Sequence, residues 1–299
     1  MSFLKSFGRK LAAFGAIAAT ACAVPAAEPK AAAPAMWKVA DSDTTIYLFG
    51  TIHLLPKGTM WRSTAFDKAA LGSDTLVVET VIDETKPEAV AAELFKLAIS
   101  DGLPPLAARV PADKKAALEA TIKKSGIPPQ LLDKTETWAA AFMLLTVQYK
   151  DLGLDSGSGV ESVLRKQFAD GGKPVDQLET NAEQLGFFDK LSEDAQRKFL
   201  IAVLDDSAEM KGQFEGMLSA WTRGDVKAIA ESFNSDLGDA IELKEALLTR
   251  RNANWARWVR GRLDKPGTVL VAVGAGHLAG DQSVVSLLQQ DGVKVTRVQ

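Results

Sequence analysis

The 299-residue chain has the composition of a globular protein, and its charge argues against one class of partner. Hydrophobic residues make up 46% of the sequence and charged residues 24%, which provides enough apolar material for a large core. The formal net charge is −3, so the chain has no basic excess with which to neutralise nucleic-acid phosphates. We therefore expect no nucleic-acid partner, and one large domain or two smaller ones.

Residues 1–27 are predicted to be a secretory signal peptide. Three basic residues lie near the start, and an uncharged, Ala-rich stretch follows over residues 11–21. This stretch is too short and too weakly hydrophobic for a membrane span, which needs about 20 apolar residues. We therefore expect a periplasmic or secreted protein with no stable transmembrane span. The alternative is a lipid anchor on Cys22, the only cysteine, and in either case the mature chain has no disulfide.

Residues 28–35 are predicted to be a flexible leader, and residues 36–299 a single domain. Its first part shows the patterns of a hairpin, a helix and a buried strand, over residues 37–49, 63–71 and 75–79. A mostly helical insertion is expected from about 83 to 262, interrupted by a strand over 173–179. The insertion contains patterns for helices over residues 87–100, 112–125, 134–150, 160–169, 182–190, 193–210, 213–222, 226–233 and 239–262. The chain then returns to a strand, a helix and a last strand, over residues 269–273, 282–290 and 293–298.

Both histidines of the chain close a Gly-x-x-His tetrapeptide that follows an apolar, strand-like run, at residues 50–53 and 274–277. One such motif by itself is explained by a strand-to-loop turn with a histidine at its rim. The matched pair indicates one site built from two halves. In both the N-terminal and the C-terminal part of the chain, the predicted order is strand, Gly-x-x-His, helix, strand. The expected fold is α/β, with a central mixed, mostly parallel sheet. Loops that follow parallel strands meet at one edge of a sheet, so His53 and His277 are expected to lie together.

Two glutamates and an arginine are further candidates. Glu79 ends the strand over 75–79, and Glu179 ends the strand over 173–179 in a similar tripeptide. A carboxylate at the end of a buried strand must be exposed or paired, and each one alone is more often a solvated strand end. Arg251 falls within the apolar stripe of the last long helix. It either snorkels along Trp255 with its head in water or points inward to a carboxylate or a reacting oxyanion.

Two His and one Glu form an open metal site, with the remaining positions left to water or substrate. The candidate ligands are His53, Glu79 and His277, and the cofactor would be a divalent cation such as Zn, Mn, Co or Fe. The candidate catalytic residues are Glu79, Glu179 and Arg251, and the choice of ligand and base between the two glutamates stays open. No His-Glu-x-x-His helix, Gly-x-Ser-x-Gly elbow or P-loop is present. The Gly-rich stretch over 153–159 follows a helix and is interpreted as a flexible connection or cap.

At these residues the chain resembles the TraB/GumN family, which also includes the Tiki-type membrane proteases. The matching segments occur in order along the chain, at residues 48–56, 77–80, 172–180, 250–255 and 273–280. The resemblance implies an α/β core with a helical insertion, and a functional centre of His53, His277 and Glu79 that is supported by Glu179, Arg251 and Asn252. Many relatives have Gly-Ile-Asp where this chain has Gly-Val-Glu ending at Glu161. Because the extra methylene moves the carboxylate, we assign Glu161 no catalytic role.

Tiki-type members are metal-dependent peptidases, so the expected function is an exported metal-dependent hydrolase that acts on a peptide or a small-molecule substrate. One alternative is a metal-free, esterase-like hydrolase with a histidine as general base, because related folds include erythromycin-esterase-like enzymes. Another is a haem- or metal-binding protein without turnover, as in haem-binding ChaN-type lipoproteins, where Tyr47 or Tyr149 would supply a phenolate. A last alternative is a catalytically silent surface or assembly factor.

Overall fold

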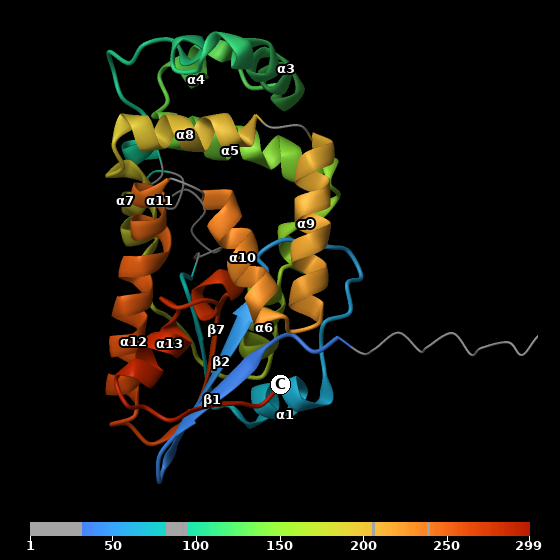
Figure 1. Ribbon diagram of the computed structural model, residues 1–299, viewed down its shortest axis with the longest axis vertical. Coiled ribbons are helices and arrows are strands. Elements are labelled where there is room, and N and C mark those ends of the chain that lie inside the picture. Colours follow the sequence, from blue (N-terminus) through green and yellow to red (C-terminus); the bar gives the residue numbers. More distant parts are fainter. Residues whose placement is uncertain (1–31, 82–91, 93–94, 205–206, 238–239) are drawn as a thin grey trace, which may run out of the picture. The chain divides into compact units, whose positions relative to one another are not determined.

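The computed structural model in Figure 1 describes residues 32–81, 92, 95–204, 207–237 and 240–299. The expected signal peptide, with Cys22, lies outside the described residues, as do most of the leader and most of the helix expected over 87–100. The described residues belong to one compact unit, 31–299. None of the described helices is long and apolar enough to cross a membrane.

A mixed, mostly parallel sheet of six strands forms the centre of the described part, with the strand order β6-β4-β7-β2-β1-β8. The strands are β1 (Met36–Ala40), β2 (Thr44–Thr51), β4 (Thr75–Val78), β6 (Val175–Gln177), β7 (Gly267–Gly274) and β8 (Val295–Arg297). Strand β4 pairs in parallel with β6 and β7, and β7 pairs in parallel with β2. Only β1 runs antiparallel to its neighbours, β2 and β8. The predicted α/β fold class and the predicted first hairpin are confirmed.

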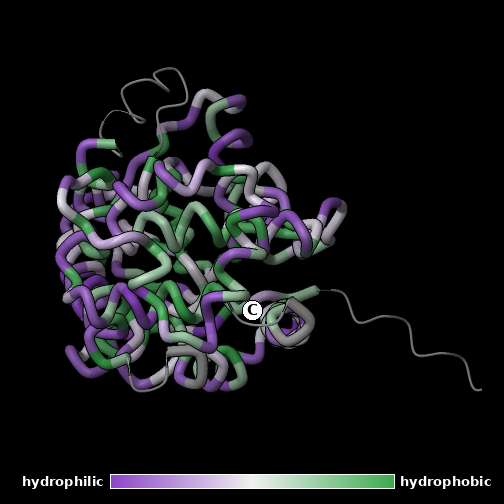
Figure 2. The backbone as a smooth tube through the Cα atoms, turned by 90° about the horizontal axis from the view of Figure 1, so that it is seen from above, coloured by the Kyte–Doolittle hydropathy of each residue, from purple (hydrophilic) through white to green (hydrophobic). Residues whose placement is uncertain are grey.

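The sheet is covered by helices on both faces, which explains why its central strands are apolar without interruption. Successive residues of a strand point to opposite faces. On β7, Leu270 packs with the helices α1 (Thr64–Gly72) and α6 (Val160–Asp170). Val269 and Val271 pack on the other face with α12 (Arg250–Arg262) and α13 (Val284–Gln290). The hydropathy colouring of Figure 2 accordingly places much of the hydrophobic chain in the interior.

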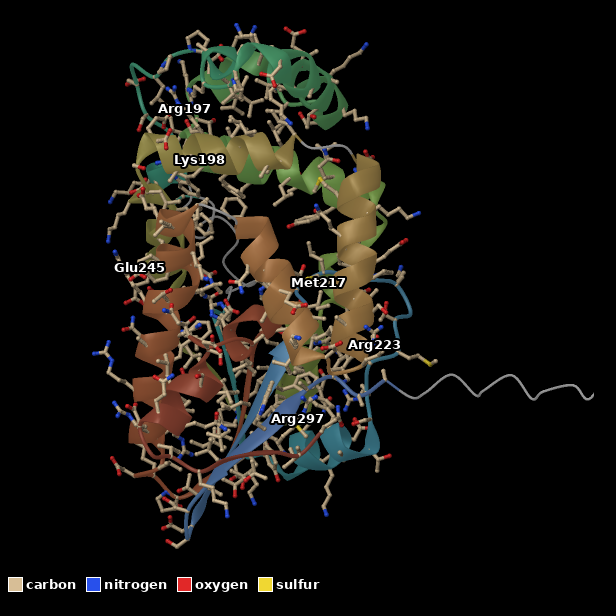
Figure 3. All side chains as sticks on the ribbon, viewed as in Figure 1. Arg197, Lys198, Met217, Arg223, Glu245 and Arg297 are labelled. Atoms are coloured by element: carbon tan, nitrogen blue, oxygen red, sulfur yellow. The ribbon has the colours of Figure 1, made fainter. Side chains whose placement is uncertain are left out.

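The described helices are α1 (Thr64–Gly72), α3 (Lys115–Ser125), α4 (Pro129–Asp133), α5 (Thr137–Asp151), α6 (Val160–Asp170), α7 (Asn181–Asp189), α8 (Glu193–Val203), α9 (Ser207–Thr222), α10 (Val226–Leu237), α11 (Ile241–Lys244), α12 (Arg250–Arg262) and α13 (Val284–Gln290). Their order agrees with the expected helical insertion, although the short helix α4 was not predicted. Figure 3 shows Arg197 and Lys198 on α8, where each forms an ion pair with a glutamate or aspartate one turn away. Such exposed pairs contribute little to stability.

The predicted break between helices 193–210 and 213–222 is wrong. Helix α9 runs through Gly212, and the interruption comes earlier, after Val203. A glycine inside a helix costs only about 1 kcal/mol relative to alanine. The packing of Phe214 and Met217 against the core offsets this cost.

A second, two-stranded ladder was also not predicted from the sequence. Strand β3 (Leu55–Pro56), which begins two residues after His53, pairs antiparallel with β5 (Leu154–Asp155). In addition, the Val160 N–H donates to the Ile52 carbonyl at 3.1 Å. The Gly-rich stretch is therefore tied to the first Gly-x-x-His loop, and it starts helix α6 beside that loop.

Candidate functional site

The two Gly-x-x-His motifs meet at the carboxyl edge of the sheet, as predicted. Strands β2 and β7 are adjacent and parallel, with Thr51 opposite Gly274. The Nε2 atoms of His53 and His277 lie 3.9 and 3.8 Å from the same atom, Oε1 of Glu79. The three side chains that were predicted as metal ligands therefore converge.

The glycines of the motifs make this convergence possible. A Cβ atom at Gly50 would lie 3.1 Å from the Cα of Ala275, so the two motif loops pack backbone against backbone. A Cβ atom at Gly274 would lie 3.2 Å from Oε1 of Glu79 and 3.3 Å from Nε2 of His53. Gly274 therefore leaves free the space toward which the three side chains point.

Glu79 and Glu179 lie side by side because their strands, β4 and β6, are parallel neighbours. The Glu179 N–H donates to the Glu79 carbonyl at 2.9 Å. Both side chains are buried, so both carboxylates require partners. The two glutamates that end similar tripeptides in the sequence are therefore neighbours in the fold.

Arg251 supplies those partners and is itself only 6% exposed. Its Nε donates to Glu179, and its Nη2 contacts Glu79 at 2.6 Å and Glu179 at 2.9 Å. Its Nη1 contacts Nε2 of His277 at 3.1 Å and the Leu247 carbonyl at 3.2 Å. All three guanidinium nitrogens are thus in contact with polar groups of the protein. The head group therefore points inward rather than into water, and it holds both glutamates and His277 in place.

The helix that carries Arg251 is irregular just before it. Helices α11 and α12 are joined without a break by a π-helical turn, Glu245–Thr249, and turns of this kind are frequent at functional sites. One turn beyond Arg251, the Trp255 indole N–H donates to Oε1 of Glu179 at 3.0 Å. The Trp255 ring also lies 4.7 Å from the guanidinium carbon, which adds a cation–π contact.

His277 is held in one tautomer by Asn252. The Asn252 side chain donates through Nδ2 to the Gln282 carbonyl at 2.8 Å, so its Oδ1 faces the imidazole at 2.6 Å from Nδ1. An oxygen acceptor there requires the proton on Nδ1, which leaves the lone pair on Nε2. Burial lowers the pKa of His277 to about 3, so this histidine is neutral at physiological pH.

His53 is oriented by Glu161, to which we assigned no role from the sequence. Nδ1 of His53 lies 2.7 Å from Oε1 of Glu161, and Thr51 donates to the same oxygen. The charge of Glu161 raises the pKa of His53 to about 10, although water screens part of this attraction because the His53 side chain is 62% exposed. The other oxygen of Glu161, Oε2, is buried and has no partner among the described residues. The longer side chain thus brings the carboxylate into the site.

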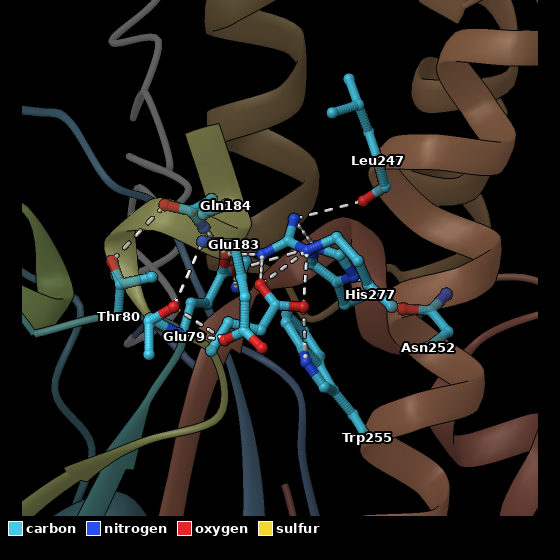
Figure 4. Close-up of polar contacts among 12 residues, drawn as sticks. Glu79, Thr80, Glu183, Gln184, Leu247, Asn252, Trp255 and His277 are labelled. Carbon is cyan, nitrogen blue, oxygen red and sulfur yellow. Dashed lines mark hydrogen bonds and ion pairs between the residues drawn. The ribbon is translucent and has the colours of Figure 1, made fainter. Parts of the chain in front are cut away.

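The electrostatics of the two strand-end glutamates differ. Burial alone would raise the pKa of Glu79, but both imidazoles, Arg251 and the Gly274 N–H hold it well below its usual range. Gln184 on α7 also donates to Oε2 of Glu79 at 3.2 Å and contacts Thr80 (Figure 4). Burial raises the pKa of Glu179, against the opposing effect of Arg251.

A cavity of about 400 Å³ opens onto part of this network. His53, Glu79 and Glu161 line it, whereas Glu179, Arg251 and His277 do not. A ligand in the cavity therefore meets His53, Glu79 and Glu161 directly.

A family model of the TraB/PrgY/gumN proteins matches residues 35–297, which include every residue of this network. The chain belongs to this family. No curated protein and no solved structure shows a significant similarity to it. The resemblance inferred from the five sequence segments is confirmed.

The family resemblance implied a divalent cation, and the TraB/PrgY/gumN site can be tested for its fit. In the described residues, no group of three or more His, Cys, Asp or Glu side chains is already arranged to hold a metal ion. Tetrahedral ligands at zinc distances are about 3.4 Å apart, so the atoms of His53, Glu79 and His277 would have to close by about 0.5 Å. Their donor types suit the ion, and Gly274 leaves the space between them. Binding of a divalent cation would require this movement and also the departure of the Arg251 N–H from Nε2 of His277.

Two members of the TraB/PrgY/gumN site were missed in the sequence. Glu161 was set aside because of its longer side chain, yet its place directly after the Gly-rich stretch was a usable signal. Gln184 had no signal, because a glutamine in a helix is usually a surface residue. Only the packing of α7 beside β4 brings it to Glu79.

Proposed function

We propose that the protein is a metal-dependent hydrolase that cleaves peptide bonds, and that His53, Glu79 and His277 hold a divalent cation. The observation that carries the proposal is the convergence of two imidazole Nε2 atoms on one oxygen of Glu79, around the space that Gly274 leaves. Binding at His277 requires the Arg251 N–H to move away from Nε2.

The charges of the site support a divalent cation. Glu79, Glu161 and Glu179 are three carboxylates, whereas Arg251 is one guanidinium. His53 carries a proton in the metal-free protein because its pKa is raised to about 10, so these four groups and His53 together carry one excess negative charge. A metal ligand must be deprotonated, and release of this proton raises the excess to two negative charges. Buried charges require compensation, and a divalent ion would supply it.

A bound divalent cation would act as a Lewis acid, which polarises a carbonyl and lowers the pKa of water. Glu161 and Asn252 hold the two imidazoles by their Nδ1 atoms, so that both Nε2 atoms face Glu79, and metal binding would require His53 to release its Nε2 proton. Glu79 lines the cavity and is assigned as the ligand. Glu179 does not line it and is held by Arg251 and Trp255, so we assign it a positioning role. Because all three guanidinium nitrogens of Arg251 contact groups of the protein and Arg251 does not line the cavity, it is likewise assigned a positioning role.

Elemental analysis of the purified protein tests the proposal. We expect about one divalent metal per chain, and its loss in His53→Ala and in His277→Ala with little change in melting temperature. Arg250→Ala, on the exposed side of α12, is the control and should retain the metal. Unchanged metal content in both histidine variants would remove the proposal.

Chelation separates the alternatives. Hydrolysis of peptide substrates should stop after exhaustive chelation and return with added metal. Activity that persists without metal would favour the metal-free hydrolase with a histidine base. Visible absorbance of the purified protein would instead indicate haem.

A further inference from the structure

The cavity beside His53 and Glu79 has an apolar side that the proposed chemistry does not use. Its apolar walls are Leu54, Val78, Phe142 and Tyr149. Its volume of about 400 Å³ lies within the range of ligand pockets, which are typically apolar with a few placed polar groups.

Helix α5 forms the aromatic wall of the cavity. Phe142 and Tyr149 are seven residues apart, so they lie on one face of the helix and about 10 Å apart along its axis. The Phe142 ring is held by edge-to-face contacts with Phe188 and Phe199, whose ring centres lie 4.6 and 5.1 Å away. The wall at Phe142 is therefore rigid before any ligand binds.

Tyr149 is the second aromatic residue of this wall. Burial raises its pKa, so the phenol is uncharged at physiological pH. No hydrogen bond to its hydroxyl is present among the described residues. Its ring thus presents an uncharged aromatic surface to the cavity.

The polar lining lies on the other elements. Thr80 follows β4, Ser162 is on α6 and Gln184 is on α7. Arg165, also on α6, lines the cavity as well, but it already has a polar or charged partner. These groups can bond a peptide backbone but do not select a side chain. Selection therefore falls to the wall of Phe142 and Tyr149.

We propose that this cavity is a specificity pocket that binds a large apolar or aromatic side chain of the substrate, next to the bond presented to His53 and Glu79. The inference rests on the proposed hydrolase function, because the apolar wall lines the same cavity as His53 and Glu79. Tyr149 is then the specificity-determining residue.

The first test is digestion of a peptide library by the metal-loaded protein, read by mass spectrometry. Peptides with Phe, Leu or Met at one position beside the cleaved bond should be cut at least tenfold more efficiently than those with Ala, since hydrophobic pockets discriminate by about 10–200-fold per methylene group. Tyr149→Ala should shift the preference to larger side chains and Tyr149→Trp to smaller ones. Lys150→Ala, exposed on the same helix, should behave as wild type. Cleavage without a size preference, or an identical preference in both Tyr149 variants, would overturn the inference while leaving the hydrolase intact.

The second test does not depend on hydrolysis. Saturation-transfer NMR would compare the binding of N-acetyl-phenylalanine amide and N-acetyl-alanine amide to the wild type and to Tyr149→Ala. We expect binding of the phenylalanine probe, at least tenfold weakened by Tyr149→Ala. If no peptide is cut but this pattern appears, the hydrolase proposal fails and the pocket stands. If both probes bind equally, or the variant has no effect, the pocket assignment fails.

Discussion

Gly274 illustrates at the scale of one residue how a missing side chain shapes the site. A methyl group on its Cα would lie 3.2 Å from Oε1 of Glu79 and 3.3 Å from Nε2 of His53. We expect Gly274→Ala to weaken metal binding by at least tenfold, because the methyl group forces the ligand atoms apart, and perturbed site geometry typically costs 10–100-fold in affinity. Competition with a metallochromic chelator measures the effect.

Gly261→Ala is the matched control for this substitution. Gly261 lies in α12, and a Cβ atom there meets no atom within 4 Å. This variant should keep its metal affinity and gain up to about 1 kcal/mol of stability from helix propensity. Equal metal affinities in the two alanine variants would show that the space at Gly274 is not part of the site.

Arg251 is the residue whose removal should cost the most stability in the site. Arg251→Ala leaves the carboxylates of Glu79 and Glu179 buried without their cation. Breaking one side of a buried ion pair costs about 3–5 kcal/mol, so we expect a large drop in the free energy of unfolding, measured by denaturant titration. Arg250→Ala and Arg257→Ala, both exposed on α12, should change it by less than about 0.5 kcal/mol. Similar losses in all three variants would contradict this prediction.

At the scale of elements, helix α10 is pressed against the second Gly-x-x-His loop. A Cβ atom at Gly276 would lie 2.7 to 2.9 Å from ring atoms of Phe233, closer than any real contact. Gly276→Ala should therefore displace the Phe233 ring from the loop and destabilise the protein by about 1–3 kcal/mol, the usual cost of overpacking. Thermal or chemical unfolding measures this change.

A double variant shows whether Phe233 is the cause. Phe233→Leu in the Gly276→Ala background should recover part of the lost stability, although Phe233→Leu alone is destabilising. Residues in contact show such coupling, whereas distant ones add independently. Strict additivity of the two changes would mean that the strain lies elsewhere in the loop.

The sheet and the helical insertion contribute different parts of the site. The strand ends of β2, β4, β6 and β7 bring His53, Glu79, Glu179 and His277 to one edge. The insertion supplies the supporting groups on α6, α7 and α12 and the aromatic wall on α5. Ligand sites of open α/β sheets lie at this edge because the loops after parallel strands gather there.

At the scale of the whole molecule, the pH dependence of stability sums all groups whose pKa changes on folding. Burial lowers the pKa of His277 from 6.5 to about 3. Between these values only the unfolded chain binds the proton, so this residue makes the metal-free protein lose stability as the pH falls, by up to about 1.4 kcal/mol per pH unit. We expect His277→Gln to flatten the acid side of the stability curve, measured by denaturant titration of chelated protein.

His53 provides a comparison with the opposite sign. Its pKa is raised to about 10 by Glu161, so its contribution is complete below the unfolded value of 6.5 and is lost as the pH rises through the folded value. His53→Gln should therefore flatten the alkaline side of the curve, by a smaller amount because the side chain is largely exposed. Parallel curves for the wild type and both variants would show that neither imidazole is shifted.

The sequence by itself determined the pairing of the two halves. Apolar runs that end in Gly-x-x-His identify two buried strands, and the loops of parallel strands can meet only at one edge, so His53 and His277 were expected to lie together. The same reasoning placed Glu79 and Glu179 at that edge and Arg251 on the buried side of its helix. Each inference relies on a period of two or 3.6 residues, which reports the face on which a side chain lies.

Only the tertiary structure decided which groups those side chains contact. Glu161 reaches His53 because the β3–β5 ladder ties α6 to the first motif, and Gln184 reaches Glu79 because α7 packs beside β4. The inward direction of Arg251 likewise depends on partners 72 and 172 residues away along the chain. Periodicity fixes a face of a helix or strand, but a partner across the fold is set by how whole elements pack, and that information is not local in sequence.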